Sequence, residues 1–329
     1  MEAFLHPPQA RKLGELIAQY SRDRQMFIAT HSSDLLSGIL AKRQEDVTVI
    51  RIDRQKNNNK IDSIDHTHLT EIMNHPLLSS SRILEAIFYK GTVIVEADSD
   101  STFYQRISRM IRTSDDIHYV HAHSKQAICK VAEAYTKLGI RFSAIVDFDA
   151  LRVQNEFRNL ISSMNIDATN LSKLIGLQEE IVKEIESTDK AHLLGELIKK
   201  LDELKTYISK SHSLDNPDKT LEEAQRELKR IREYSSPWCN YKASGYNALT
   251  IETQKKFLEL DTICRGYGIF LVPVGELESW LITYGVDRVS NKSKWIVNAL
   301  TILNGIHIAE NEPLGKFIIA IHEYLLKEV

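Results

Sequence analysis

The sequence predicts an α/β protein built on a parallel sheet, and three observations lead to this expectation. Short apolar strands alternate with helical segments over residues 92–146, an order typical of parallel strands joined by helices. The alternation then stops, and residues 151–235 form a long, highly charged stretch with helical spacing. The strand pattern returns at 269–272 and leads into further helices. We therefore expect a parallel-sheet domain that carries a helical insertion.

Composition sets the broad class of the protein. The chain has 329 residues, of which 43% are hydrophobic and 26% charged, enough for two or three domains with real cores. The net charge of -3 means that a nucleic-acid contact would need a local concentration of Lys and Arg. The three cysteines form no C-x-x-C pair, which argues against a zinc site or a disulfide framework. With no signal peptide and no apolar run of the roughly 18 residues that span a bilayer, we expect a soluble cytoplasmic protein with no membrane partner.

The first 88 residues are expected to form a smaller α/β unit. Its second helix can be capped by Ser32 or Ser33, and its two later strands are joined by a polar turn, as in a hairpin. The expected elements are a helix over 9–23, a short buried strand at 26–29, a helix over 32–38, strands at 46–53 and 60–64, and helical segments from Leu69 and over 80–88.

The second unit is expected to contain the parallel sheet. Since ligands bind outside the carboxyl ends of the strands in such sheets, the residues that follow each strand are candidate site residues. The expected elements are strands at 92–95, 119–122, 143–146 and 269–272, and helices over 101–111, 126–138, 276–284, 293–303 and 314–327.

Two segments near the start of the chain resemble parts of an ABC-type ATPase. Residues 2–9, Glu-Ala-Phe-Leu-His-Pro-Pro-Gln, resemble the stretch that follows the Walker B strand in that family. Residues 27–32, Phe-Ile-Ala-Thr-His-Ser, resemble the strand and switch histidine of the same family, and the histidine would be His31. No G-x-x-x-x-G-K-[ST] phosphate loop is present, and the catalytic Walker B carboxylate would fall before Met1. We therefore expect ATP binding and hydrolysis only together with an N-terminal ATPase half that this chain lacks.

Carboxylates follow three of the predicted strands. An Asp at the end of one strand is usually a helix cap, but three acidic groups in this order are expected to meet at one edge of the sheet. So many carboxylates repel one another unless cations neutralise them, and Mg²⁺ is the natural ion because no Cys or His accompanies them. Two such ions can hold the attacking and leaving oxygens of a phosphodiester. The acidic residues are Glu96 and Asp100, Asp147 and Asp149, and Glu276 and Glu278.

The pattern of Glu96 with Asp100, followed by Asp147-x-Asp149, resembles the acidic signature of the Toprim domain of topoisomerases, primases and certain nucleases. From Glu2 to its last helices, the chain is similar to the overcoming-lysogenization-defect (OLD) family, in which an ABC ATPase precedes a Toprim nuclease. The resemblance implies a C-terminal ATPase fragment over 1–88 and a Toprim domain over 89–329, with the helical insertion at 151–235. It also implies a Mg²⁺-dependent DNA endonuclease that serves phage defence.

The resemblance assigns roles to the acidic residues. It implies that Glu96 is a metal ligand and general base, that the other five carboxylates bind metal, and that Glu278 is a better candidate than Glu276. Two Mg²⁺ ions per site are implied, for which Mn²⁺ or Ca²⁺ can substitute. The implied partners are DNA, taken to be double-stranded, the N-terminal ATPase half, and a second copy of the chain, since ABC cores pair as dimers.

Basic residues complete the predicted site. The resemblance implies a lysine near the scissile phosphate, where Lys292 and Lys294 open a predicted helix, and Lys294 is favoured as the catalytic lysine. A solvated surface lysine is the alternative interpretation. Lys125 and Arg230 are, with Lys292, candidate DNA contacts, although Lys125 follows Ser124 where related sequences carry glycine.

Two other functions compete with the nuclease. A topoisomerase would need a nucleophilic tyrosine, for which Tyr104, Tyr234 and Tyr246 are available, but no gate domain is recognisable. The other alternative is a regulatory Toprim module that binds DNA or a nucleotide through Mg²⁺ without cutting.

Overall fold

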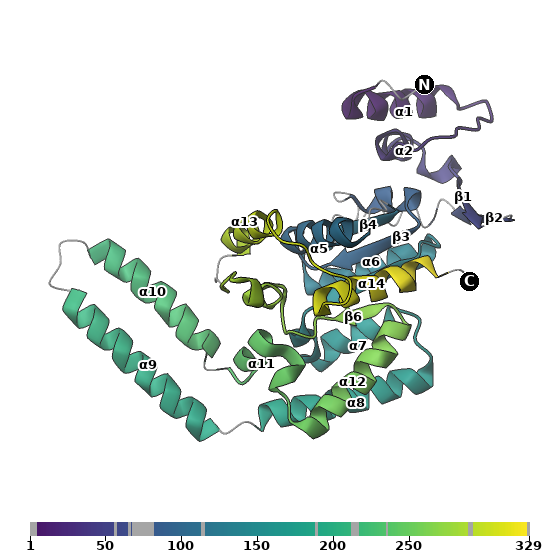
Figure 1. Ribbon diagram of the computed structural model, residues 1–329. Helices are drawn as coiled ribbons and strands as arrows, with labels where there is room; N and C mark the ends of the chain where they lie inside the picture. The colour runs from purple at the N-terminus through teal and green to yellow at the C-terminus, as the bar shows by residue number, and fades with distance from the viewer. Residues whose placement is uncertain are drawn as a thin grey trace.

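The computed structural model of the chain describes residues 5–55, 58–64, 67, 82–112, 116–187, 190–211, 217–234, 236–288 and 292–327. At its centre lies a four-stranded sheet in which every neighbouring pair of strands is parallel (Figure 1). The strand order is β4–β3–β5–β6, with β3 at Gly91–Val95, β4 at Ile117–His121, β5 at Phe142–Val146 and β6 at Ile269–Leu271. All four predicted strands of this unit are confirmed, with bounds that shift by at most two residues.

Helices cover both faces of the sheet, because successive side chains of a strand point to opposite sides. Val93 and Phe270 face one layer, and Ile94 and Leu271 face the other. The first layer consists of α5 (Asp98–Ile111), α13 (Lys292–Leu303) and α14 (Pro313–Leu326). The second consists of α6 (Lys125–Lys137), α7 (Gln154–Ser162), α8 (Ala168–Glu186) and α12 (Ile251–Gly266). The sheet is therefore buried on both faces, as parallel sheets usually are.

The predicted helical insertion is present but divides into two parts. Its first helices, α7 and α8, pack into the core beside the sheet. Its later helices, α9 (Lys190–Ser211) and α10 (Pro217–Tyr234), form a hairpin that projects from the body (Figure 1). Leu204, Ala224 and Ile231 are buried between these two helices. The described part of the chain has no helix long and apolar enough to cross a bilayer.

The N-terminal unit contains α1 (Pro7–Tyr20), α2 (Ser33–Leu40) and a hairpin of β1 (Val49–Gln55) and β2 (Asn58–Ile64). Ser32 caps α2 as predicted, since its Oγ accepts a hydrogen bond from the Leu35 N–H at 3.1 Å. The short 3-10 turns η2 (Gln44–Asp46) and η3 (Arg82–Phe88) complete the unit. The helix predicted from Leu69 lies outside the described residues.

Two predicted elements are wrong. Residues 26–29 form no strand: neither sheet includes them, and Phe27 is 85% exposed. An apolar run becomes a buried strand only when another strand satisfies its backbone, and neither sheet of the described chain does so. Residues 276–284 form two 3-10 turns, η6 (Leu277–Ser279) and η7 (Ile282–Tyr284), instead of one helix. Gly275 and Gly285, with φ of 109° and 79°, bend the chain on either side of these turns.

His322 on α14 is expected to make the fold sensitive to acid. It is 1% exposed, and its Nε2 lies 2.9 Å from the Ser108 Oγ. Burial, helped by the charge of Arg112, lowers the pKa of His322 from 6.5 to about 4. Between pH 6.5 and about 4, His322 is therefore protonated in the unfolded chain but neutral in the folded chain. Because the unfolded state binds the extra proton, the free energy of unfolding should fall as the pH drops through this range. Urea unfolding across this range should show a shallower decline for His322→Gln, and equal declines in both proteins would contradict the prediction.

Candidate functional site

Acidic side chains from three adjacent strands meet at the carboxyl edge of the sheet. Glu96 directly follows β3, Asp147 directly follows β5, and Glu278 lies in η6 just after β6. The two later loops are joined by their backbones, since the Phe148 N–H donates to the Gly275 carbonyl at 2.7 Å. Asp100, in the first turn of α5, belongs to the same group. We call Glu96, Asp100, Asp147 and Glu278 the acidic cluster.

The carboxylates of the acidic cluster shift one another's pKa values. Burial raises the pKa of Glu96, and the neighbouring charge of Asp147 raises it further. Burial and then Asp147 raise the pKa of Asp100 to about 7, although the Ala97 N–H donates to its Oδ2 at 3.1 Å. The pKa of Glu278 is likewise raised, by burial first and by acidic neighbours that include Asp147. The charge of Asp147 thus raises the pKa of each of the other three carboxylates.

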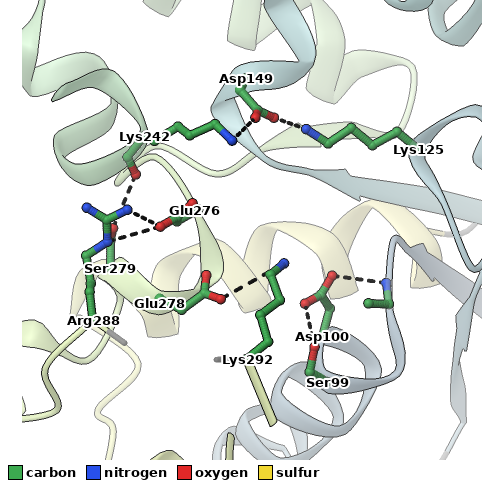
Figure 2. Close-up of polar contacts among 11 residues, drawn as sticks. Ser99, Asp100, Lys125, Asp149, Lys242, Glu276, Glu278, Ser279, Arg288 and Lys292 are labelled. Carbon is green, nitrogen blue, oxygen red and sulfur yellow. Dashed lines mark hydrogen bonds and ion pairs between the residues drawn. The ribbon is translucent and has the colours of Figure 1, made fainter. Parts of the chain in front are cut away.

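Lys292, the first residue of α13, enters the acidic cluster. Figure 2 shows its side chain between Glu278 and Asp100, and its Nζ lies 4.0 Å from the Glu278 Oε1. Burial lowers the pKa of Lys292, but the four carboxylates outweigh that effect and raise the pKa above its ordinary value. Lys292 and Lys294 are both exposed, but Lys294 does not rank among the main charges acting on the cluster. The geometry favours Lys292 over Lys294, and the choice of a catalytic lysine stays a prediction.

Asp149 stands apart from the acidic cluster. Its side chain is only 9% exposed, and both of its oxygens form ion pairs with lysines (Figure 2). Oδ1 contacts the Nζ of Lys125, and Oδ2 lies 2.6 Å from the Nζ of Lys242. Burial lowers the pKa of Lys125, and the charges of Glu96 and Asp147 oppose this shift. The structure therefore joins a predicted metal ligand, Asp149, to a predicted DNA contact, Lys125.

Lys242 is a site residue that the sequence did not reveal. It lies in α11 (Trp238–Ser244), in a stretch for which the sequence predicts no element. The Ser279 Oγ donates to the carbonyl of Ala243 at 3.0 Å, which fastens α11 to the loop that carries the acidic residues after β6. A Cβ on Gly275 would lie 2.2 Å from the Lys242 carbonyl, so the two backbones touch at that point. No local motif signals such a contact.

Glu276 borders the acidic cluster, where its charge helps to raise the pKa of Glu278, and it is paired with an arginine. Its Oε1 accepts from the Nε of Arg288 at 3.0 Å and also from the Nη2 of the same guanidinium (Figure 2). Its assignment as a metal ligand stays a prediction, and its engaged oxygen makes it a weaker candidate than Glu278.

The remaining predicted residues lie elsewhere. His31 is exposed, with its ring centroid 6.1 Å from that of Phe88. Since Phe88 precedes β3, His31 lies towards the amino end of the sheet, opposite the acidic cluster. Arg230 belongs to α10, but its side chain lies outside the described residues. Neither residue is brought to the cluster in the part of the chain that is described.

The acidic cluster fits a hard divalent cation by the chemistry of its donors. All four side chains offer carboxylate oxygens, which Mg²⁺ prefers. Glu278 is 4% exposed, and its Oε2 is buried without a hydrogen-bond partner among the described residues. Within the same residues, no three His, Cys, Asp or Glu side chains already stand close enough together to hold an ion. Small side-chain movements would therefore have to accompany metal binding.

Comparison with known families supports part of this picture. Residues 87–149 match the family described as "Overcoming lysogenization defect protein-like, TOPRIM domain". The match runs from the end of η3 to Asp149, so it contains three members of the acidic cluster but neither Glu278 nor the helical insertion. No curated protein matches the chain.

The match does not cover the N-terminal unit, so its resemblance to ABC-type ATPases stays a prediction. The roles assigned to individual site residues and the domain boundaries also stay predictions. Toprim domains in general bind Mg²⁺ and typically serve nucleases or primases. The parallel four-stranded sheet with helices on both faces agrees with such a domain. The fold is therefore α/β of the Toprim type, and residues 87–149 are similar to the Toprim domain of OLD-like proteins.

Proposed function

We propose that the chain is a metal-dependent endonuclease that hydrolyses phosphodiester bonds of double-stranded DNA. The observation that supports this function best is the convergence of the acidic cluster with Lys292 at one edge of a Toprim-type sheet. Carboxylates bind the cation, and the ammonium group beside them stabilises negative charge that develops on a phosphate. The site thus combines ligands for a cation with a group that attracts the substrate anion.

The chain's own residues have distinct parts in this reaction. Glu96, Asp100, Asp147 and Glu278 would hold Mg²⁺, which when bound supplies Lewis acidity and a more acidic water. Glu96 is half-buried with a raised pKa, so it is suited to accept a proton from the attacking water. Lys292 remains charged because its pKa is raised, and it lies at the start of α13, where the helix dipole also favours an anion.

Tyr104 is poorly suited to the nucleophilic role that a topoisomerase would require. It is 1% exposed, and its Oη accepts a hydrogen bond from the Trp280 Nε1 at 3.1 Å. Burial raises the pKa of Tyr104 well above its ordinary value, so the phenol stays protonated. This environment favours hydrolysis by water over covalent catalysis by that tyrosine.

The setting of the activity is a further part of the proposal. We propose that an N-terminal ATPase half controls the nuclease, that two copies of the chain form a dimer, and that the cytoplasmic assembly acts in phage defence. The resemblance to the OLD family supports these points.

The first test is a nicking assay on supercoiled plasmid with Mg²⁺, Mn²⁺, Ca²⁺ or EDTA. We expect nicking with Mg²⁺ or Mn²⁺, none with EDTA, and none from Glu96→Ala, because that change removes both a cation ligand and the proton acceptor. Glu310→Ala, on an exposed glutamate, is the matched control and should cut like the wild type.

The outcomes separate the proposed function from its alternative. Undiminished nicking by Glu96→Ala would show that the acidic cluster is not the site of cleavage. Metal-dependent DNA binding without nicking under any of these conditions would favour a regulatory module that does not cut.

A further inference from the structure

The surroundings of Asp149 do not suit a metal ligand. Both of its oxygens are engaged by ammonium groups, and its side chain is 9% exposed. An ion at these oxygens would have to share them with Lys125 and Lys242, whose positive charges oppose its binding. In the acidic cluster, by contrast, Lys292 is the main cation that acts on Asp100 and Glu278, whereas Lys125 acts on Glu96 more strongly than Lys292 does.

We propose that Asp149 binds no metal ion and instead anchors Lys125 and Lys242 as a binding site for a backbone phosphate that neighbours the scissile one. This inference rests on the proposed function, because it names the substrate contact of the same site.

Charge divides the site into two halves. One carboxylate between two ammonium groups leaves a net positive charge around Asp149. Four carboxylates around Lys292 leave a net negative charge in the acidic cluster. A divalent cation is therefore drawn to the cluster and a phosphate to the lysine pair. Without Asp149, the two ammonium groups would repel each other and separate.

The backbone holds both lysines in place. Lys125 is the first residue of α6, whose cap is Ser124: the Ser124 Oγ accepts from the Ala127 N–H at 3.2 Å. Lys242 is placed by the contact of α11 with Gly275, in the same loop as Glu278. The backbone elements that carry the two lysines thus fix the position of the phosphate site relative to the acidic cluster.

The lysine pair is accessible from solvent. The side chains of Lys125 and Lys242 are 26% and 39% exposed, so each can turn one donor towards a ligand while it keeps its contact with Asp149. Lys125 also lines a cavity of about 490 Å³ between α6 and α7, together with Lys130, Asn159 and Ser162. This cavity begins at Lys125 of the proposed phosphate site and offers space for the adjoining nucleotide.

The metal arm of the test compares Asp149→Asn with Asp147→Asn. Mn²⁺ binding is measured by electron paramagnetic resonance on DNA-free protein. We expect Asp147→Asn to weaken Mn²⁺ affinity by about tenfold or more, and Asp149→Asn to change it by less than about twofold. A loss with Asp149→Asn that equals the loss with Asp147→Asn would overturn the proposal. Circular dichroism on each variant verifies that it is folded.

The DNA arm uses Lys125→Met and Lys242→Met and does not depend on a change to a buried carboxylate. Binding of a fluorescent DNA duplex is measured in EDTA over a series of salt concentrations. Each variant should bind more weakly and reduce the slope of log affinity against log salt by about one, the effect of one lost phosphate contact. Lys255→Met, on the exposed surface of α12, is the control and should match the wild type.

Wild-type affinity and salt slope in Lys242→Met would overturn the proposal. Neither arm requires cleavage. A chain that passes both arms but never nicks DNA would therefore contradict the proposed nuclease and leave the phosphate site standing.

Discussion

Asp147→Asn is expected to slow metal-dependent DNA cleavage by roughly 10³-fold or more while the protein stays folded. Asp147 is the one carboxylate whose charge acts on all the other members of the acidic cluster and on Lys292. A bound cation contributes several kcal/mol to the stabilisation of the transition state, and each 1.36 kcal/mol corresponds to a factor of ten in rate. Nicking rates at saturating Mg²⁺ measure the effect.

The fold should survive this change. Asparagine has nearly the same shape as aspartate, and its neutral side chain relieves repulsion among buried carboxylates when no cation is present. In EDTA, Asp147→Asn should therefore unfold at the same temperature as the wild type or at a higher one. Asp202→Asn, on the exposed surface of α9, should leave both rate and stability unchanged. A folded Asp147→Asn protein that nicks within about tenfold of the wild-type rate would contradict the assignment.

The sheet and the acidic cluster could be predicted because their signals are local. A buried parallel strand is a short apolar run, and the residue just after it must lie at the carboxyl edge. Glu96 and Asp147 are such residues, so their meeting follows from the order of elements. The same reasoning failed at 26–29, since an apolar run also needs a partner strand, and the described chain supplies none.

The cationic residues of the site depend on information that spacing does not contain. Lys292 and Lys294 differ by two helical positions, which turns their side chains about 200° apart around the helix axis. Only the packing of α13 against the sheet decides which of them faces the acidic cluster. Lys242 is even harder to predict from the sequence, because it contacts Asp149 only through the docking of α11. Neither its neighbours in sequence nor its own residue type indicates that contact.

Gly245→Ala is expected to cost about 2–4 kcal/mol of the free energy of unfolding, because Gly245 lies where α11 meets the loop after β6. Its φ of 58° and ψ of -139° fall in a region that residues with a Cβ rarely adopt. The added Cβ would lie 1.8 Å from the Pro273 carbonyl oxygen and 2.6 Å from the Gly275 nitrogen. Both are backbone atoms, so no side-chain rotation relieves the clash and α11 must shift. Urea unfolding measures the cost.

Gly176→Ala in α8 is the matched control for this prediction. A Cβ on Gly176 would meet nothing within 4 Å, so alanine should raise helix stability by about 0.5–1 kcal/mol. The shift of α11 in Gly245→Ala should also draw Lys242 away from Asp149 and weaken DNA binding in EDTA, which Gly176→Ala should not do. Wild-type stability in Gly245→Ala would mean that α11 is not docked tightly against the site. A stability loss with unchanged DNA affinity would instead mean that Lys242 is not held by that docking. Stability and DNA binding are expected to fall together, because one backbone contact supports both the fold and the lysine.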